Sequence, residues 1–297
     1  MYAKILPLAA FTLITGCSEG TKDGVGATST LMLVQEKRLE ELLPTGEYEA
    51  SGVTLVDGSL RIVFDNRTEV ASVDLELSKG SLGPGKKSKS QYEGITLATQ
   101  PSKRMYVVKE IGAGDRGAIV TLDEVGKVIA TESTDIAFTD QGKGLEGIAW
   151  LDAPERLLVL CEARGCGLGN DGLGVIKALR HEGDSWTTDA TIALPSKARF
   201  EDFADLAVIP EADGVYRVAV LSQESSALWV GMLSMSPPAI VDAGIVYDFP
   251  KENGRLAYCR LEGVTFIDRN TFGLVSDRPK NAGDCTKTEA VHVFKAP

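Results

Sequence analysis

The chain has 297 residues and a formal net charge of −11 at pH 7. This acidic excess argues against nucleic acid and anionic lipid surfaces as partners, because both are negatively charged. With 43% hydrophobic residues, a chain of this length can bury the core of one sizeable domain.

Residues 1–16 have the pattern of a bacterial lipoprotein signal peptide. Lys4 precedes an uncharged run, residues 5–16, that is too short to span a bilayer but suits a secretory apolar region. Residues 14–17 (Ile-Thr-Gly-Cys) resemble a lipobox, so we expect Cys17 to be acylated and to become the mature N-terminus. The alternative is an ordinary secreted protein in which Cys17 has no special role.

The residues after Cys17 indicate in which membrane the lipoprotein would be anchored. Ser18 stands where an Asp would be expected in a lipoprotein kept at the inner membrane, so we predict an outer-membrane anchor facing the periplasm. Residues 17–28 are rich in Gly, Ser and Thr and form the expected lipidated tether. Since Lys4 is the only charged residue among residues 1–16, removal of that segment changes the formal charge from −11 to −12.

The next predicted elements are a strand at residues 29–34 and a short helix at residues 36–43. Beyond them a short motif, Leu-Glu-Gly followed by apolar residues or a close variant, begins five runs: residues 50–55, 92–97, 145–150, 204–209 and 261–266. A second apolar run with a polar end follows each copy: residues 60–65, 105–110, 157–162, 218–224 and 272–277. Short strands repeated about every 40–60 residues are typical of a β-propeller.

Further strands complete the units. Runs rich in Val and Ile predict them at residues 118–122, 127–131, 175–179, 187–194, 227–233, 240–247 and 290–294. The last unit is one strand short, so the strand at residues 29–34 is expected to join it and close the ring. We therefore predict an all-β, five-bladed β-propeller over residues 29–297, or six blades if residues 46–53 hide an extra unit.

The strand pairing also predicts where polar side chains meet. Antiparallel neighbours place the start of the first strand beside the end of the second, so acids from every unit should gather at one mouth of the channel. The candidate metal or ligand residues are Glu93, Glu146, Glu162, Asp205, Glu224, Glu262 and Asp277. Crowded carboxylates raise one another's pKa and attract a cation, and Ca²⁺ is the natural candidate for oxygen ligands.

Basic residues stand near these acids and leave two alternatives open. Lys109, Arg164 and Arg278 could hold a phosphate or other anion beside Ca²⁺, or they could simply form structural salt bridges with the acids. Neither His181 nor His292 has an obvious partner in the sequence, which argues against a His-based catalytic triad or a three-His zinc site.

Four cysteines remain after Cys17. Export makes disulfides favourable, and sequence proximity with the strand layout favours Cys161 with Cys166 and Cys259 with Cys285. The alternative is four buried thiols.

Two glycine-rich segments resemble nucleotide-binding loops but lack their context. Residues 167–172 match G-x-G-x-x-G without a following helix, and residues 80–87 place Lys87 where a P-loop needs Ser or Thr. We interpret both as loops. Trp150 and Trp229 are expected in the core or between blades, whereas Trp186 could be exposed.

The repeats resemble the SdiA-regulated β-propeller family of exported bacterial proteins. The pieces that carry this resemblance are residues 51–54, 93–96, 144–150 and 262–264, together with Glu162 and Asp277, over residues 50–297. The resemblance implies no established activity. More distantly, the ring of acids is similar to the phytase propellers, which use Ca²⁺.

Two functions follow as hypotheses. The first is a lipid-anchored envelope module that binds Ca²⁺, a small ligand or an envelope protein at the acidic mouth. The second is a Ca²⁺-dependent phosphoesterase of the phytase-like kind.

Overall fold

The fold was analysed in a computed structural model, which describes residues 29–100, 102–138, 144–162, 173–212, 214–278 and 285–297. Strands dominate these residues, and the helical pieces are α1 (Leu39–Leu42) and the 3₁₀ turn η1 (Ser196–Ala198). No helix in the described residues is both long and apolar enough to cross a membrane.

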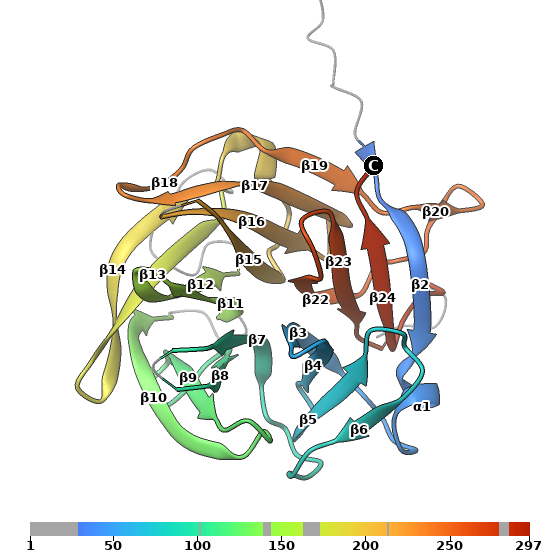
Figure 1. The fold of residues 1–297 in the computed structure, drawn as a ribbon, viewed down its shortest axis with the longest axis horizontal. Helices are drawn as coiled ribbons and strands as arrows, with labels where there is room; N and C mark the ends of the chain where they lie inside the picture. The colour runs from blue at the N-terminus through green and yellow to red at the C-terminus, as the bar shows by residue number, and fades with distance from the viewer. Residues whose placement is uncertain (1–28, 101, 139–143, 163–172, 213, 279–284) are drawn as a thin grey trace, which may run out of the picture.

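The described strands radiate from a common axis (Figure 1), and we divide them into five groups by their inner strands, although groups two and three belong to one eight-stranded sheet. Group one contains β3 (Ala50–Val56), β4 (Ser59–Phe64), β5 (Arg67–Asp74) and β6 (Gly80–Leu82). Group two contains β7 (Tyr92–Ala98), β8 (Arg104–Lys109), β9 (Arg116–Leu122) and β10 (Val128–Ala137). Group three contains β11 (Leu145–Asp152), β12 (Glu155–Cys161), β13 (Val175–Glu182) and β14 (Ser185–Ala193).

The remaining two groups include both ends of the described chain. Group four contains β15 (Asp205–Ala212), β16 (Val215–Ser222), β17 (Ala227–Met235), β18 (Pro238–Ile240), β19 (Ile245–Asp248) and β1 (Ser29–Thr30). Group five contains β22 (Leu261–Phe266), β23 (Thr271–Ser276), β24 (Ala290–Lys295) and β2 (Met32–Arg38). A small hairpin, β20 (Lys251–Glu252) with β21 (Arg255–Leu256), lies between these groups in sequence.

The innermost strands follow one another around the axis. β3 lies beside β7, β7 beside β11, β11 beside β15 and β15 beside β22, and β22 returns to β3. The five repeat starts predicted from the sequence are these inner strands. The all-β propeller fold is therefore confirmed. Residues 46–53, where an extra unit would have to lie, form the approach to β3 and its first four residues.

The N-terminal strand joins the last group, as predicted. β2 pairs antiparallel with β24 from Met32↔Lys295 to Arg38↔Ala290, and β1 pairs with β19 of group four. The strand extends further than expected, so the helix predicted at residues 36–43 is wrong at its start and is limited to Leu39–Leu42. One continuous segment thus contacts two groups and joins the N-terminal and C-terminal parts of the ring (Figure 1).

Two other predictions need correction. Residues 240–247 do not form one strand, because β18 ends at Ile240 and β19 begins at Ile245, leaving a turn that contains Gly244 at a φ of 63°. Residues 80–87 are not entirely loop, since Gly80–Leu82 is β6, the outermost strand of group one.

Buried apolar side chains lie between neighbouring groups rather than in one central core. One cluster, for example, joins Leu158 and Leu160 of β12 to Val218 and Val220 of β16. Trp229 is fully buried, as predicted, while Trp186 is only 3% exposed and the expectation of exposure was wrong. Burial of this surface between flat sheets is the main force that holds the groups together.

Cys259 and Cys285 form the predicted disulfide, with their Cα atoms 6.0 Å apart. Cys166 and Cys17 lie outside the described residues. The proposed Cys161–Cys166 pair and the lipidation at Cys17 therefore stay predictions.

Candidate functional site at the acidic mouth

A β-bulge opens four of the five inner strands. The register skips between Ala50 and Gly52, between Tyr92 and Ile95, between Leu145 and Gly147, and between Leu261 and Gly263. The extra residues in these bulges include Ser51, Glu93, Glu146 and Glu262. Because a bulge adds a residue that has no direct partner, it changes the direction of the side chain and frees it from the regular alternation of the strand.

These bulge residues meet the ends of the second strands, as the antiparallel geometry predicted. Together they line a cavity of about 570 Å³, which we call the acidic mouth. Its bulge residues are Ser51, Glu93, Glu146 and Glu262, and its strand-end residues are Asp65, Glu110, Glu162, Gln223 and Asp277. Glu49, Asp202, Lys89 and Arg278 complete its charged lining.

Among the described residues of the mouth, Glu93 and Glu146 have pKa values raised well above the usual value for Glu. Burial is the main cause that raises the pKa of each well above 4.5, and neighbouring carboxylates raise it further. Glu93 faces Asp65, Glu262 and Glu110, and Glu146 faces Glu93 and Glu162. The largest influences on both pKa values are burial and other carboxylates, and all of them raise the pKa. The mouth therefore favours any ligand that brings positive charge.

Below the acids, the inner strands approach one another backbone to backbone. A Cβ placed on Gly52 would lie 2.5 Å from the carbonyl oxygen of Glu93, and one on Gly94 would lie 2.9 Å from that of Glu146. A Cβ on Gly263 would lie 2.8 Å from the Cα of Gly52. We call Gly52, Gly94, Gly147 and Gly263 the glycine ring. These glycines allow the close approach of the inner strands, since no side chain fits there.

Asp205 completes this ring, which corrects its predicted place in the mouth. It pairs with Leu221 without a bulge, so it stands level with the glycines rather than with Glu93 or Glu146. Its carboxylate accepts hydrogen bonds from the backbone N–H groups of Leu206 and Val264, both at 2.8 Å, and from that of Ile148.

These donors come from three successive inner strands, β11, β15 and β22. Burial raises the pKa of Asp205, and the three N–H donors oppose that rise by favouring the charged form. Asp205 thus joins three inner strands through these hydrogen bonds, so its carboxylate already acts as a structural clasp.

The other predicted residues are placed differently from the mouth acids. Glu224 is not among the described residues that line the mouth, and its backbone N–H donates to Asp202 (3.0 Å). Lys109 likewise does not appear in the described lining. Arg278 does line it, but its guanidinium pairs with Glu47 (3.6 Å) and Glu49 (3.8 Å). Arg164 lies outside the described residues.

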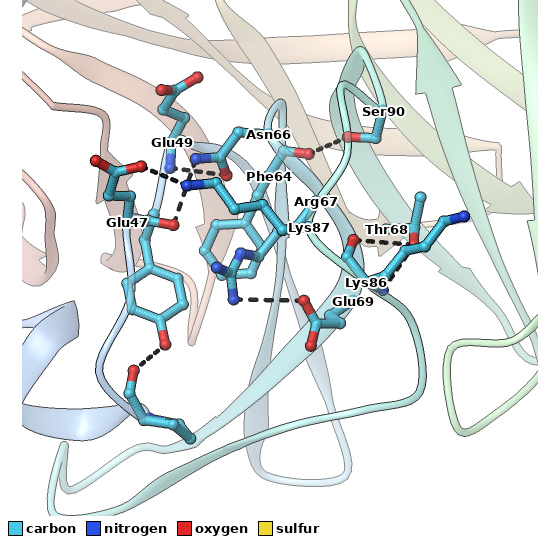
Figure 2. A network of polar contacts seen from close by, with 12 residues as sticks. Glu47, Glu49, Phe64, Asn66, Arg67, Thr68, Glu69, Lys86, Lys87 and Ser90 are labelled. Atoms are coloured by element: carbon cyan, nitrogen blue, oxygen red, sulfur yellow. Dashed lines mark hydrogen bonds and ion pairs between the residues drawn. The ribbon is translucent and has the colours of Figure 1, made fainter.

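Basic side chains beside the mouth are engaged in structural contacts. Figure 2 shows Lys87 bound to Glu47 (2.5 Å) and Arg67 paired with Glu69 (3.4 Å) in group one. Arg67 is also buried, with its guanidinium carbon 4.4 Å from the centre of the Tyr48 ring. The salt-bridge alternative therefore describes this flank of the mouth well, while it does not account for Glu93 and Glu146.

Asp202 is a mouth residue that the candidate list omitted. Ser222 donates a hydrogen bond to its carboxylate, and burial raises its pKa. A signal existed in the sequence, because residues 198–205 (Ala-Arg-Phe-Glu-Asp-Phe-Ala-Asp) depart from the repeat pattern at this point.

Both histidines have acidic partners, which corrects the expectation that neither had one. His181 Nε2 lies 3.0 Å from Glu132, and His292 Nδ1 lies 3.0 Å from Glu36. His292 Nε2 also lies 2.9 Å from Ser276 Oγ, so serine, histidine and acid form a chain of contacts. Ser276 and His292 are both 0% exposed, and a substrate has no access to this serine. The arrangement is structural.

The acids of the mouth are dispersed around its wall. Among the described residues, no group of three or more His, Cys, Asp or Glu side chains stands in an arrangement ready to hold a metal ion. A cation that binds here would have to draw carboxylates from several inner strands toward it.

Comparisons with known proteins support the fold class. No protein-family model and no curated protein matches the chain. A β-xylosidase structure is similar with a TM-score of 0.53 and 10% identity, over 88% of this chain and 94% of that one. A PQQ-bound aldose sugar dehydrogenase from Streptomyces coelicolor has a TM-score of 0.48 and 14% identity, over 89% of this chain and 98% of that one.

A streptogramin B lyase has a TM-score of 0.44 and 11% identity, over 89% of this chain and 98% of that one. At 10% identity, the likeness to the β-xylosidase structure shows a shared fold and nothing about activity. The chain is a β-propeller.

Proposed function

We propose that the chain is a binding propeller whose acidic mouth takes a cationic ligand, with Ca²⁺ as the first candidate. The observation that carries this proposal is the pair Glu93 and Glu146. These neighbouring acids are held by bulges in a confined space, and the pKa of each is raised by burial and by other carboxylates. A bound cation would remove that repulsion, so binding is favourable at the pH where the acids ionise.

Ca²⁺ suits the chemistry of this wall. It takes six to eight oxygen ligands in flexible geometry, and the mouth offers carboxylates from all five strand groups or the segments beside them, with Asp202 next to group four. Rotation of the Glu side chains would bring their oxygens onto the ion, a change that commonly accompanies binding.

The test is a calorimetric titration of chelator-treated protein with CaCl₂, together with its melting temperature. We expect saturable binding and a higher melting temperature with Ca²⁺. Glu146→Gln should weaken binding at least tenfold, whereas Glu124→Gln, an exposed acid outside the mouth, should not. If the titration shows no heat of binding and Ca²⁺ does not change the melting temperature, Ca²⁺ is not the ligand.

A Ca²⁺-dependent phosphoesterase is the second candidate, and it has less support. An anionic substrate needs basic groups, and the described mouth lining offers two, Lys89 and Arg278, of which Arg278 is already paired with acids. Lys109 stands apart from that lining. Hydrolysis of p-nitrophenyl phosphate that depends on Ca²⁺ and disappears in Glu146→Gln would favour this candidate over simple binding.

We also propose that the propeller is anchored to the outer membrane, facing the periplasm, through a lipid on Cys17. The support comes from the apolar run at residues 5–16 and the lipobox-like residues 14–17. Its relation to the SdiA-regulated propellers rests on the repeat pattern alone. Radiolabelled palmitate should be incorporated into the wild-type protein and not into Cys17→Ser, and the variant should leave the membrane fraction.

A further inference from the structure

A second cavity lies at the other end of the inner strands. It has a volume of about 720 Å³, and its lining begins at the residues just after the glycine ring, such as Val53, Ile95 and Ile148. The acidic mouth is lined by the residues just before that ring, such as Ser51, Glu93 and Glu146. The two cavities are therefore separated by the glycine ring and Asp205, and we call the second one the apolar mouth.

The apolar mouth has two chemically different sides. At the same position of the repeat, groups three and four supply Ala149 and Ala207, which leave open space. Groups five, one and two supply Thr265, Thr54 and Thr96 at that position. Thr96 Oγ1 accepts a hydrogen bond from the backbone N–H of Trp150 at 2.9 Å, so this hydroxyl links the neighbouring inner strands β7 and β11. Hydroxyl groups thus gather on one side and small apolar side chains on the other.

The two carboxylates at this end each have side-chain partners, neutral donors for Asp152 and arginines for Glu211. Asp152 accepts hydrogen bonds from Trp150 Nε1 (2.8 Å) and Thr99 (3.3 Å). Glu211 forms ion pairs with Arg217 (2.6 Å) and Arg269 (2.7 Å). A ligand in this cavity therefore meets two separate carboxylates, one ion-paired and one hydrogen-bonded, in contrast to the crowded carboxylates of the acidic mouth.

We propose that the apolar mouth binds one uncharged, largely apolar small molecule that carries a hydrogen-bonding oxygen on one side. Its volume lies within the range of small-molecule sites, and such sites combine apolar walls with a few converging polar groups. The apolar part of the ligand lies over Ala149, Ala207 and Val208, while its oxygen faces the threonine hydroxyls. This site is independent of the cation proposed above, because the glycine ring lies between them.

The test uses the uncharged fluorescent probe N-phenyl-1-naphthylamine with the full chain. We expect a saturable rise in probe fluorescence at one probe per protein. Val208→Trp fills the cavity and should weaken binding at least tenfold, while Val241→Trp, at an exposed site outside it, should bind as the wild type does. The proposal is overturned if the probe does not bind saturably or binds Val208→Trp unchanged.

A second variant keeps the test valid if Val208→Trp does not fold. Leu55→Glu places an uncompensated carboxylate on another wall of the cavity, and it should also weaken probe binding at least tenfold with an unchanged circular dichroism spectrum. Glu146→Gln should leave probe binding unchanged, because it alters only the acidic mouth.

1-Anilinonaphthalene-8-sulfonate has similar rings with a negative charge and should bind at least tenfold more weakly. Equal binding of both probes would contradict the assignment to uncharged ligands.

Discussion

Glu146 occupies the extra position of a β-bulge, and this position determines its chemistry. In a regular strand its side chain would alternate into the space between two groups, whereas the bulge directs it into the acidic mouth. Asp205, which lacks the bulge, lies at the level of the glycines and bonds backbone N–H groups instead. A shift of one residue in register therefore separates a candidate ligand from a structural clasp.

The raised pKa of Glu146 predicts a pH effect on stability. The native state holds this proton longer than the unfolded chain, so the contribution of Glu146 to stability falls as pH rises above 4.5 toward the raised native value. With chelator present, the melting temperature of Glu146→Gln should rise relative to that of the wild type as pH increases from 5 to 8. The expected rise is roughly 2–4 °C for each kcal/mol of destabilisation that the substitution removes.

Thermal melts of both proteins across this pH range measure the effect. Glu124→Gln serves as the control and should follow the wild type, because Glu124 is exposed and lies outside the mouth. A Glu146→Gln variant that loses stability relative to the wild type as pH rises would show that Glu146 is a stabilising anion.

At the scale of the element, the glycine ring sets how closely the inner strands approach. Gly94→Ala should lower the free energy of unfolding by about 1–3 kcal/mol, the usual cost of overpacking. The reason is that its Cβ would lie 2.9 Å from both the Glu146 carbonyl oxygen and the Ile148 nitrogen, and backbone atoms cannot move aside independently.

Gly273→Ala is a matched control on a second strand. Its Cβ would meet only side-chain carbons, the nearest being Leu60 Cδ2 at 3.2 Å, and these can adjust by rotation. Urea denaturation of both variants measures the difference. Equal losses would indicate that the cost comes from the strand conformation rather than from contact between neighbouring groups.

At the scale of the whole molecule, the N-terminal strand holds the ring closed through one charged cluster. Glu36 of β2 binds Lys287 Nζ (2.7 Å) and His292 Nδ1 (3.0 Å), both from the C-terminal part of the chain. The hydrogen bond with His292 is the largest influence that lowers the pKa of Glu36, to about 2. Burial is the largest influence that lowers the pKa of His292.

This cluster predicts acid-sensitive closure. Because the pKa of Glu36 is lower in the native state, its carboxylate contributes stability that is present above pH 4.5. This stability is lost as the pH falls toward 2. Glu36→Gln should therefore cost about 2 kcal/mol at pH 7 and show a flatter stability profile below pH 4.5. Buried His292 adds a separate loss as pH falls below 6.5, because the unfolded chain takes up a proton more readily.

Urea denaturation at several pH values measures both effects. Glu41→Gln is the control on the same segment, since Glu41 pairs with exposed Lys37 on the surface and should contribute little. Parallel pH profiles for the wild type and Glu36→Gln would show that Glu36 is not the residue that makes the closure sensitive to acid.

The sequence by itself determined the repeats, the propeller fold, the pairing of the N-terminal strand with the last unit and the gathering of acids at one end. These follow from local rules, because apolar periodicity specifies strands and antiparallel pairing specifies which ends meet. Only the tertiary structure decided the placement of Asp205, Glu224 and Lys109, the partners of His292 and the existence of the apolar mouth.

The physical reason is that these features depend on register and on packing between groups. A bulge shifts one strand by a single residue, and a cavity is defined by side chains from all five inner strands at once. Glu36 and His292 are 256 residues apart in sequence and meet only when the ring closes. No local pattern contains such contacts, so they arise only in the assembled propeller.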